Sequence, residues 1–115
     1  MKIVNKPWGH ELIWAETDNY VGKILHINAK QKLSRQYHIL KEETFMIQGG
    51  DMFLEIGIPG TDEFNVIHMS PGDTYHCPPK TIHRMVANTD VDVIEVSTNH
   101  LDDVVRLEDD YDRIK

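Results

Sequence analysis

The chain has 115 residues, of which 40% are hydrophobic and 27% are charged, a composition typical of a folded protein and not of a disordered one. This length predicts a single domain, residues 1–115, with one core. Its 19 acidic and 12 basic residues give a formal net charge of −7 without a basic patch, so we expect neither nucleic acid nor a membrane surface as a partner.

The sequence also predicts the compartment. No stretch approaches the roughly 18 apolar residues of a membrane-spanning helix. The first residues, MKIVNKPWGHE, lack the apolar run of a secretory signal. The single cysteine, Cys77, has no partner within the chain for a disulfide. We therefore expect a cytoplasmic protein.

The N-terminal segment contains Pro7 and Gly9 on either side of Trp8. Proline lacks a backbone donor and glycine favours turns, so we expect this segment to be irregular. Regular structure is expected from Glu11, where a short strand extends to Trp14.

The next apolar run predicts a strand in which Lys23, Leu25 and Ile27 share one face, because alternate residues of a strand point the same way. Lys23 is therefore a charged residue on a mostly apolar face. Its side chain either extends along the sheet to reach solvent or points into a polar cavity. The pattern leaves both alternatives open.

Four side chains with nitrogen or oxygen donor atoms form a candidate metal site, three of them within residues 33–49 and one far downstream. Gln36 and His38 are two residues apart and point to the same side of a strand, and Glu43 begins the next apolar run. A further histidine, His83, lies far downstream. These four side chains supply ligands for one divalent metal ion. The alternative interpretation is that they are ordinary polar residues at a hairpin.

Beyond this stretch, turns rich in Gly, Pro, Ser and Asp recur about every ten residues and separate short apolar runs. The turn at 48–51 predicts that 45–48 and 52–56 form a β-hairpin. No segment before residue 100 has a helical period, so the pattern is that of an all-β sandwich or barrel. The tail, 100–115, is acidic, and we expect it to form a short turn or an extended arm.

Two segments together resemble the paired sequence motifs of the cupin superfamily. The first spans 33–49, the second contains Gly72, Pro78, His83 and Asn88, and two predicted strands separate them. The resemblance implies an all-β cupin fold, a jelly-roll β-barrel with the metal ligands facing its interior. We expect this barrel to have an irregular N-terminal segment and a short acidic C-terminal arm.

A narrower resemblance covers nearly the whole chain. The succession KPWGHE, LSRQYH, PPKTIHRMVAN and VIEVST, followed by RLEDDYDR at 106–113, is similar to type II phosphomannose isomerases. In that family the cupin is the C-terminal domain of a bifunctional mannose-1-phosphate guanylyltransferase/mannose-6-phosphate isomerase, and this chain resembles a stand-alone version of it. The resemblance implies four metal ligands, Gln36, His38, Glu43 and His83.

The activity that the resemblance implies is aldose–ketose isomerisation of the mannose-6-phosphate isomerase type, through a metal-stabilised enediolate. Such a reaction needs a group that moves a proton beside a carbonyl. The candidate catalytic residues are Lys23, Lys41 and Glu95, the last of which lies on an apolar strand. Lys41 stands where the family has arginine, and lysine lacks the bidentate fork that grips phosphate.

Three functions from different classes are compatible with these residues. The first is a metal-dependent isomerase of a sugar or sugar phosphate, which the full-length resemblance favours. The second is a non-catalytic cupin that binds a metal and a carbohydrate, which the lysine at position 41 favours. The third is another metal-dependent cupin enzyme such as a dioxygenase, which Gln36 disfavours because oxygenase sites favour more histidine.

We expect one divalent metal ion as the cofactor. Zinc is the first choice, and manganese, nickel and iron are alternatives that a mixed nitrogen and oxygen ligand set accepts. The expected partners are a small sugar or sugar phosphate and a second copy of the chain, because small cupins commonly form homodimers.

Overall fold

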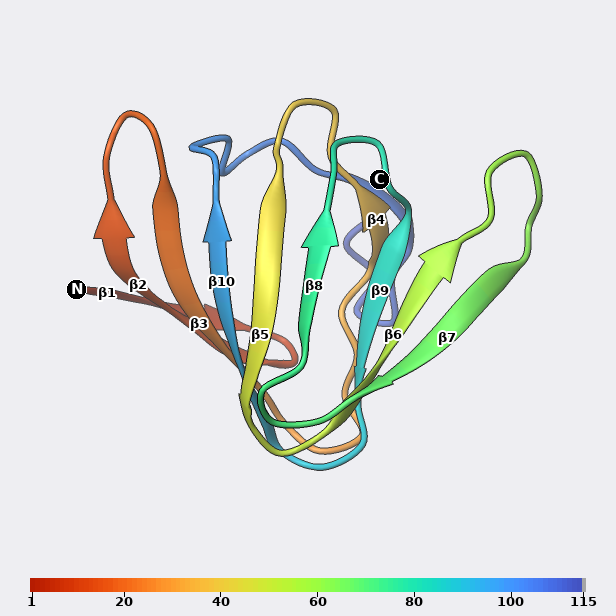
Figure 1. The fold of residues 1–115 in the computed structure, drawn as a ribbon, viewed down its shortest axis with the longest axis horizontal. Coiled ribbons are helices and arrows are strands. Elements are labelled where there is room, and N and C mark those ends of the chain that lie inside the picture. The colour runs from red at the N-terminus through yellow and green to blue at the C-terminus, as the bar shows by residue number, and fades with distance from the viewer. Residues whose placement is uncertain (115) are drawn as a thin grey trace.

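The structure is a computed structural model that describes residues 1–114. Within these residues all regular elements are strands, and no helix is long and apolar enough to cross a membrane (Figure 1). The strands are, in chain order, β1 (Lys2–Lys6), β2 (Gly9–Glu16), β3 (Val21–Ile27), β4 (Arg35–Tyr37), β5 (Glu43–Gly49), β6 (Met52–Gly57), β7 (Phe64–Met69), β8 (Thr74–Cys77), β9 (His83–Ala87), β10 (Val91–Ser97) and β11 (Val105–Glu108).

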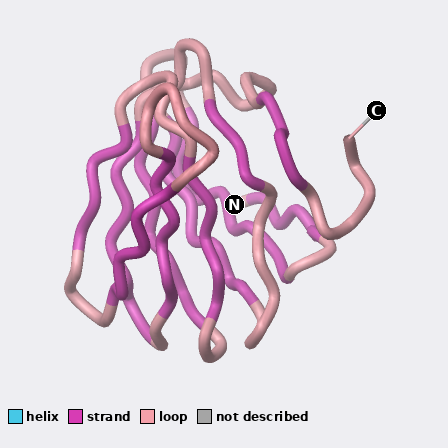
Figure 2. Tube along the Cα trace, turned by 90° about the vertical axis from the view of Figure 1, so that its right-hand side faces the viewer, coloured by secondary structure: helices cyan, strands magenta, loops and turns pink. Residues whose placement is uncertain are grey.

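The strands form two antiparallel sheets. One has the order β1-β2-β3-β10-β5-β8, and the other has the order β11-β4-β9-β6-β7. The loops gather mainly at the two ends of the strands (Figure 2). The predicted all-β jelly-roll fold is therefore confirmed, in the form of a sandwich. The two sheets of the described chain do not join into one continuous hydrogen-bonded barrel.

The inner faces of the sheets are divided into an apolar half and a polar half. On β5, Phe45 and Ile47 lie in the core, and Glu43 precedes them on the same face. On the neighbouring antiparallel strand β10, Val93 lies in the core and Glu95 follows it on the same face. The core therefore fills one end of the sandwich, and the buried polar side chains gather at the other.

The N-terminal segment is not irregular, contrary to the expectation from Pro7 and Gly9. Strands β1 and β2 form an antiparallel hairpin, and Pro7 lies in the turn between them, where its missing N–H removes no ladder hydrogen bond. Gly9 has a φ of +155°, and a Cβ at this position would lie 1.9 Å from the backbone oxygen of His26. Glycine therefore allows β2 to approach β3 closely.

The predicted hairpin of 45–48 with 52–56 is wrong. Strand β5 pairs with β10 and β8 in one sheet, whereas β6 pairs with β7 and β9 in the other. The turn at Gly50, which has a φ of +75°, passes the chain from one sheet to the other. Turn residues mark a reversal of the chain, but they do not decide whether the two flanking strands pair with each other or pack face to face.

The C-terminal segment adds an edge strand to the five-stranded sheet and then contacts neighbouring parts of the sandwich. Strand β11 pairs with β4, and beyond it Asp110 accepts a hydrogen bond of 2.8 Å from the guanidinium of Arg84 on β9. The hydroxyl of Tyr111 donates a hydrogen bond to the side-chain oxygen of Gln31. The predicted acidic arm is therefore an integral part of the sandwich.

Candidate metal centre

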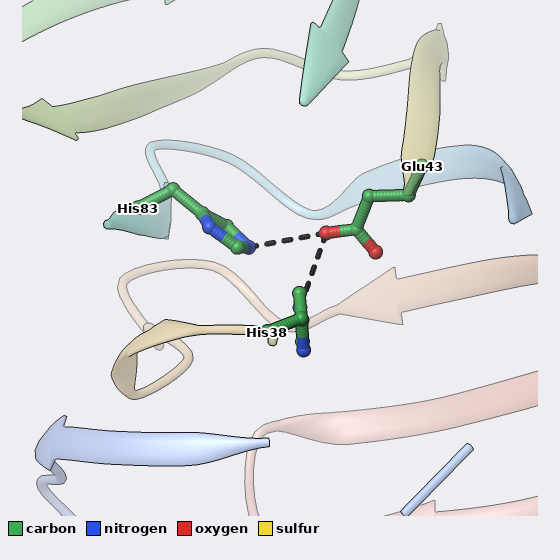
Figure 3. A group of neighbouring side chains, drawn as sticks. All are labelled: His38, Glu43 and His83. Atoms are coloured by element: carbon green, nitrogen blue, oxygen red, sulfur yellow. Dashed lines mark ion pairs between the residues drawn. The ribbon is translucent and has the colours of Figure 1, made fainter. Parts of the chain in front are cut away.

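Three buried side chains, His38, Glu43 and His83, meet at the polar end of the sandwich (Figure 3). Glu43 opens β5, His83 opens β9 and His38 immediately follows β4. Glu43 Oε1 lies 3.3 Å from His38 Nε2 and 3.1 Å from His83 Nε2, so one carboxylate oxygen faces both rings. The potential ligand atoms all lie within 4.8 Å of one another, which is close enough for one ion to bind all three.

Hydrogen bonds on the far side of each ring fix its tautomer. His38 Nδ1 lies 2.6 Å from the backbone oxygen of Asp103, and His83 Nδ1 lies 2.8 Å from that of Thr81. A carbonyl oxygen only accepts, so each Nδ1 carries the proton and donates it. In the neutral rings, each Nε2 then turns a lone pair toward the Glu43 carboxylate. This arrangement is repulsive unless a proton or a metal cation lies between them.

These residues fit a divalent metal ion. His38 Nε2 is buried and makes no hydrogen bond within residues 1–114, although buried polar atoms are normally paired. Two imidazole nitrogens and a carboxylate form a ligand set that zinc enzymes use, and the same set suits manganese, nickel and iron. A carbonyl bonded to the other ring nitrogen is also the usual support of a histidine ligand.

The fourth predicted ligand, Gln36, lies beside this cluster. It stands opposite His83 in the β4–β9 pair and lines the same cavity as Glu43 and His83. Its side-chain oxygen accepts a hydrogen bond of 2.8 Å from the hydroxyl of Ser34. An amide oxygen has two lone pairs, so this hydrogen bond leaves one for a metal ion, and Gln36 stays a predicted ligand.

Two predicted catalytic residues, Lys41 and Glu95, form a chain of charges with Glu43. Lys41 Nζ lies 3.0 Å from Glu43 Oε2 and 3.3 Å from Glu95 Oε2, and all three side chains are buried. They line a cavity of about 50 Å³ that His83 also lines. Lys41 therefore connects the cluster to a second carboxyl group.

The third predicted catalytic residue, Lys23, points into this cavity and not to solvent. Its Nζ lies 3.3 Å from Glu11 Oε1, and both residues line the cavity. The structure thus decides between the two alternatives for Lys23. Glu11 is a site residue that the sequence analysis missed. A signal was present, because Glu11 alternates with Ile13 on one face of β2 and Ile13 is buried.

Burial and neighbouring charges shift the pKa values of these groups. Burial alone would lower the pKa of Lys41, but the carboxylates of Glu95 and Glu43 outweigh it and raise the pKa. Burial alone would raise the pKa of Glu43, but its close contacts with the rings of His38 and His83 and the charge of Lys41 lower it. Burial and the charge of Glu43 raise the pKa of Glu95. Glu43 is therefore the carboxyl group that stays ionised as a candidate ligand, and Glu95 is the carboxyl group best able to hold a proton.

Metal binding is expected to release protons. In the metal-free protein burial opposes protonation of His83, but interactions with Cys77 and Glu43 raise its pKa to about 10, so the ring is protonated at pH 7. A metal ion must displace this proton to reach Nε2.

Calorimetric titration with Zn²⁺ in buffers of different ionisation enthalpy should show about one proton released per ion at pH 7. Affinity should rise as the pH increases toward 10. Binding without proton release would contradict this protonation state.

Asp103 is a second residue that the sequence analysis missed. Its carboxylate accepts hydrogen bonds from the backbone N–H groups of Ile39, Leu40 and Lys41 at 3.0, 2.7 and 2.9 Å. These bonds lower the pKa of Asp103 to about 2. Because its carbonyl oxygen also accepts from His38, this one residue fixes the loop that holds a candidate ligand and a candidate catalytic lysine. The residues that it contacts are far away in sequence, so no local pattern reveals the role.

Replacing Asp103 with alanine keeps the backbone carbonyl that accepts from His38 but removes the carboxylate that holds the loop 39–41. Because this loop joins His38 to Glu43, metal binding is expected to weaken about 10- to 100-fold, the usual effect of losing the support of a ligand. Affinity is measured by competition with a chromophoric chelator, and the absorption spectrum of bound Co²⁺ reports the ligand geometry. Asp109→Ala is the matched control, because it removes a carboxylate of similarly low pKa that is bonded to Arg113 in the same segment. Unchanged affinity and an unchanged Co²⁺ spectrum would contradict the role of Asp103.

A sandwich of two antiparallel sheets with a buried cluster of two histidines and a glutamate at one end defines a cupin with a candidate metal centre. The chain belongs to the mannose-6-phosphate isomerase C-terminal family, whose sequence model matches residues 1–109. The resemblance predicted from the sequence is thereby confirmed. A search of curated proteins found no match to the chain.

Solved structures share the fold at low sequence identity. KdgF from Halomonas sp. is 20% identical, with a TM-score of 0.76 over 89% of this chain and 91% of that chain. A cupin superfamily protein from Desulfitobacterium hafniense is 14% identical, with a TM-score of 0.66 over 76% and 74%. Oxalate decarboxylase from Lactobacillus farciminis, in a formate complex, is 15% identical, with a TM-score of 0.76 over 92% of this chain and 33% of that chain. These likenesses establish the cupin fold alone.

Proposed function

We propose that the protein is a metal-dependent isomerase that interconverts the aldose and ketose forms of a sugar or sugar phosphate. The observation that carries this proposal is the pairing of Lys41 and Glu95 beside the buried cluster of His38, Glu43 and His83. A metal site alone suits many reactions, whereas an adjacent buried carboxyl group also provides a place for the proton that isomerisation moves. Membership in the mannose-6-phosphate isomerase C-terminal family supports the same class of reaction.

Isomerisation moves a proton between two adjacent carbons of the sugar, and its difficult step places negative charge on a neighbouring oxygen. A divalent metal held by His38, Glu43 and His83, with Gln36, would supply Lewis-acid stabilisation of this charge when bound. Lys41 adds a fixed positive charge in the same cavity, because the carboxylates around it keep it protonated.

Glu95 is the proposed proton carrier. Its side chain is buried, and burial together with the charge of Glu43 raises the pKa of the carboxyl group, which favours a role in holding and releasing a proton. Although Glu95 Oε2 lies 3.3 Å from Lys41 Nζ, it makes no hydrogen bond of good geometry within residues 1–114. Lys23, paired with Glu11 in the same cavity, is the proposed contact for a sugar hydroxyl.

The proposal is tested by incubating the purified protein with mannose 6-phosphate and fructose 6-phosphate, and with mannose and fructose, after loading with Zn²⁺, Mn²⁺, Ni²⁺ or Fe²⁺. We expect interconversion of at least one pair, which stops on chelation and returns when the metal is restored. No conversion with any of the four metals, in samples that retain bound metal, would overturn the isomerase proposal.

A second candidate is a cupin that binds a metal and a carbohydrate without turnover. The ion pairs of Lys41 with both Glu43 and Glu95 favour it, because they engage a lysine that would otherwise contact the ligand. Sugar binding that persists without interconversion would support this candidate. Iron in the protein as isolated, together with oxygen consumption, would instead support the dioxygenase alternative.

Zinc as the bound metal, a homodimer and a cytoplasmic location remain predictions from the sequence. Elemental analysis of the protein as isolated tests the first, and light scattering during size-exclusion chromatography tests the second. Fractionation of the source cells tests the third.

A further inference from the structure

The six-stranded sheet carries a second pair of histidine rings in contact. His10 on β2 and His26 on β3 are directly opposite each other in the antiparallel pairing of these strands. Their ring centroids are 5.1 Å apart, and the angle between the ring planes is only 19°. Within residues 1–114, the other contact between two histidine rings is that of His38 with His83 in the candidate metal centre.

Strand alternation places this pair on the outer face of the sheet, away from the buried cluster. Glu11 follows His10 and lines the buried cavity. The residues on either side of His26, Leu25 and Ile27, lie in the apolar core. Successive side chains of a strand point to opposite faces, so both histidines project outward. The two pairs of rings are therefore on opposite faces of one sheet.

A neighbouring carboxylate prepares His26 to act as a ligand. Asp92 on β10 is the strand partner of His26, and β10 lies next to β3 in the sheet (Figure 1). Asp92 Oδ1 lies 2.7 Å from His26 Nδ1. A carboxylate oxygen only accepts, so Nδ1 carries the proton, and in the neutral ring Nε2 keeps its lone pair. A carboxylate bonded to the other ring nitrogen is a usual support of a metal-binding histidine.

His10 supplies a second nitrogen. Its ring stacks on His26 but makes no ion pair or hydrogen bond within residues 1–114, so no polar contact fixes its orientation. Two imidazole nitrogens that bind one ion at about 2.0–2.1 Å each lie at most about 4.2 Å apart. Directly opposite residues of two strands have Cβ atoms about 4.5–5.5 Å apart, so rotation of the His10 ring can bring its nitrogen into this range.

The surroundings of the pair admit a cation. The row of strand partners continues with Asn5 beside His10 and with Gly49 beside Asp92. This row contains no lysine or arginine, and Asp92 adds a negative charge to it. The side chain of His26 is 28% exposed, which allows an ion to reach it from solvent.

We propose that His10 and His26 bind one divalent transition-metal ion on the outer face of the six-stranded sheet, with Asp92 holding the His26 ring in place. This site goes beyond the proposed function and does not rest on it. Imidazole ligands suit copper, nickel and zinc, and affinities of divalent ions peak at copper. Cu²⁺ is therefore expected to bind most tightly, Ni²⁺ and Zn²⁺ less tightly, and Mn²⁺ least. A bound ion would join β2 to β3.

Titration of the tag-free protein with Cu²⁺, followed by NMR of the histidine rings, tests the site. Paramagnetic Cu²⁺ broadens the signals of nearby nuclei, so the signals of His10 and His26 are expected to broaden together. His68 is the internal control. It is more exposed, at 53%, and pairs with a carboxylate, Asp51, but its ring stacks on a phenylalanine and not on a second histidine. Broadening of His68 at the same Cu²⁺ concentration as His10 and His26 would overturn the proposal.

Equilibrium dialysis against a fixed concentration of free Cu²⁺ then counts the bound ions. His10→Gln and His26→Gln are each expected to weaken this site about 100-fold, within the range by which two linked binding groups exceed one. Each variant should therefore bind about one ion fewer per chain than the unaltered protein, whereas His68→Gln should bind the same number. Equal copper content in the unaltered protein, His10→Gln and His26→Gln would overturn the proposal.

Glu43→Gln separates this site from the buried cluster. The ion held by the pair should remain in this variant and should be lost when His26→Gln is added to it. A Glu43→Gln protein whose bound copper does not depend on His26 would overturn the proposal. Thermal melting of each metal-free sample identifies a variant that fails to fold. The NMR titration needs only the unaltered protein and therefore decides the matter if a variant does not fold.

Discussion

Replacing Glu43 with glutamine is expected to lower metal affinity about a thousandfold, because it removes the negatively charged member of the cluster of His38, Glu43 and His83. Glu43 Oε1 faces both histidine rings, and Oε2 lies 3.0 Å from Lys41 Nζ. Breaking a buried charged cluster by removing one partner costs about 3–5 kcal/mol. About 4 kcal/mol corresponds to a thousandfold change in a binding constant. The affinity is measured for Zn²⁺ and Co²⁺ by competition with a chelator of known affinity.

The neighbouring residue provides the matched control for this substitution. Glu42 is exposed, and its carboxylate pairs with His76 and not with the buried cluster. Glu42→Gln therefore changes the net charge equally and should leave the affinity within about twofold, as expected for a surface charge. A Glu43→Gln variant that binds metal within about tenfold of the unaltered protein would show that this cluster is not the metal site.

Replacing Glu95 with glutamine is expected to lower kcat about 10²- to 10⁴-fold, the usual contribution of a positioned acid or base. Glutamine has nearly the same shape but cannot take up or release the proton. Glu95 is not within the ligand cluster, so metal affinity is expected to stay within about threefold. Turnover of the sugar pair identified by the assay is measured together with metal content.

The outer face of the same strand provides the control. Asp92 also lies on β10, but its carboxylate is bonded to the ring of His26 and is partly exposed to solvent. Asp92→Asn should leave kcat within about twofold, because exposed pairs of this kind contribute little. A Glu95→Gln variant that keeps its kcat within about threefold, with its metal in place, would exclude Glu95 as the proton carrier.

The site residues that could be predicted from the sequence are those whose positions follow from strand alternation or from short spacing along the chain. On β3 and β10, strict alternation of side chains places Lys23 and Glu95 on the inner faces, and the structure finds both in one cavity. His38 and Glu43 flank one short loop, so their convergence also follows from local spacing. The all-β class was predictable for a similar reason, because turn residues recur between short apolar runs.

The rest of the arrangement depends on contacts between distant segments. The turn at Gly50 gives no indication that β5 and β6 belong to different sheets, since a sandwich corner and a hairpin use the same residues. Asp103 supports the loop after β4 across a long stretch of chain. Arg106 on β11 lines one cavity with Lys2 and Lys6 on β1, although the two strands belong to different sheets and lie near opposite ends of the chain. No periodicity in the sequence encodes these three facts.

Asp103, which accepts a hydrogen bond from His38, is synthesised after all three members of the candidate metal cluster. His38 and Asp103 are 65 positions apart, so a ribosome has made both histidines and Glu43 before the residue that orients one of the rings emerges. A nascent chain therefore exposes the candidate metal ligands before their geometry is set. We infer that the geometry of the candidate metal site is complete only after β11 has paired with β4. Which metal ion the protein keeps would then be decided at the end of folding.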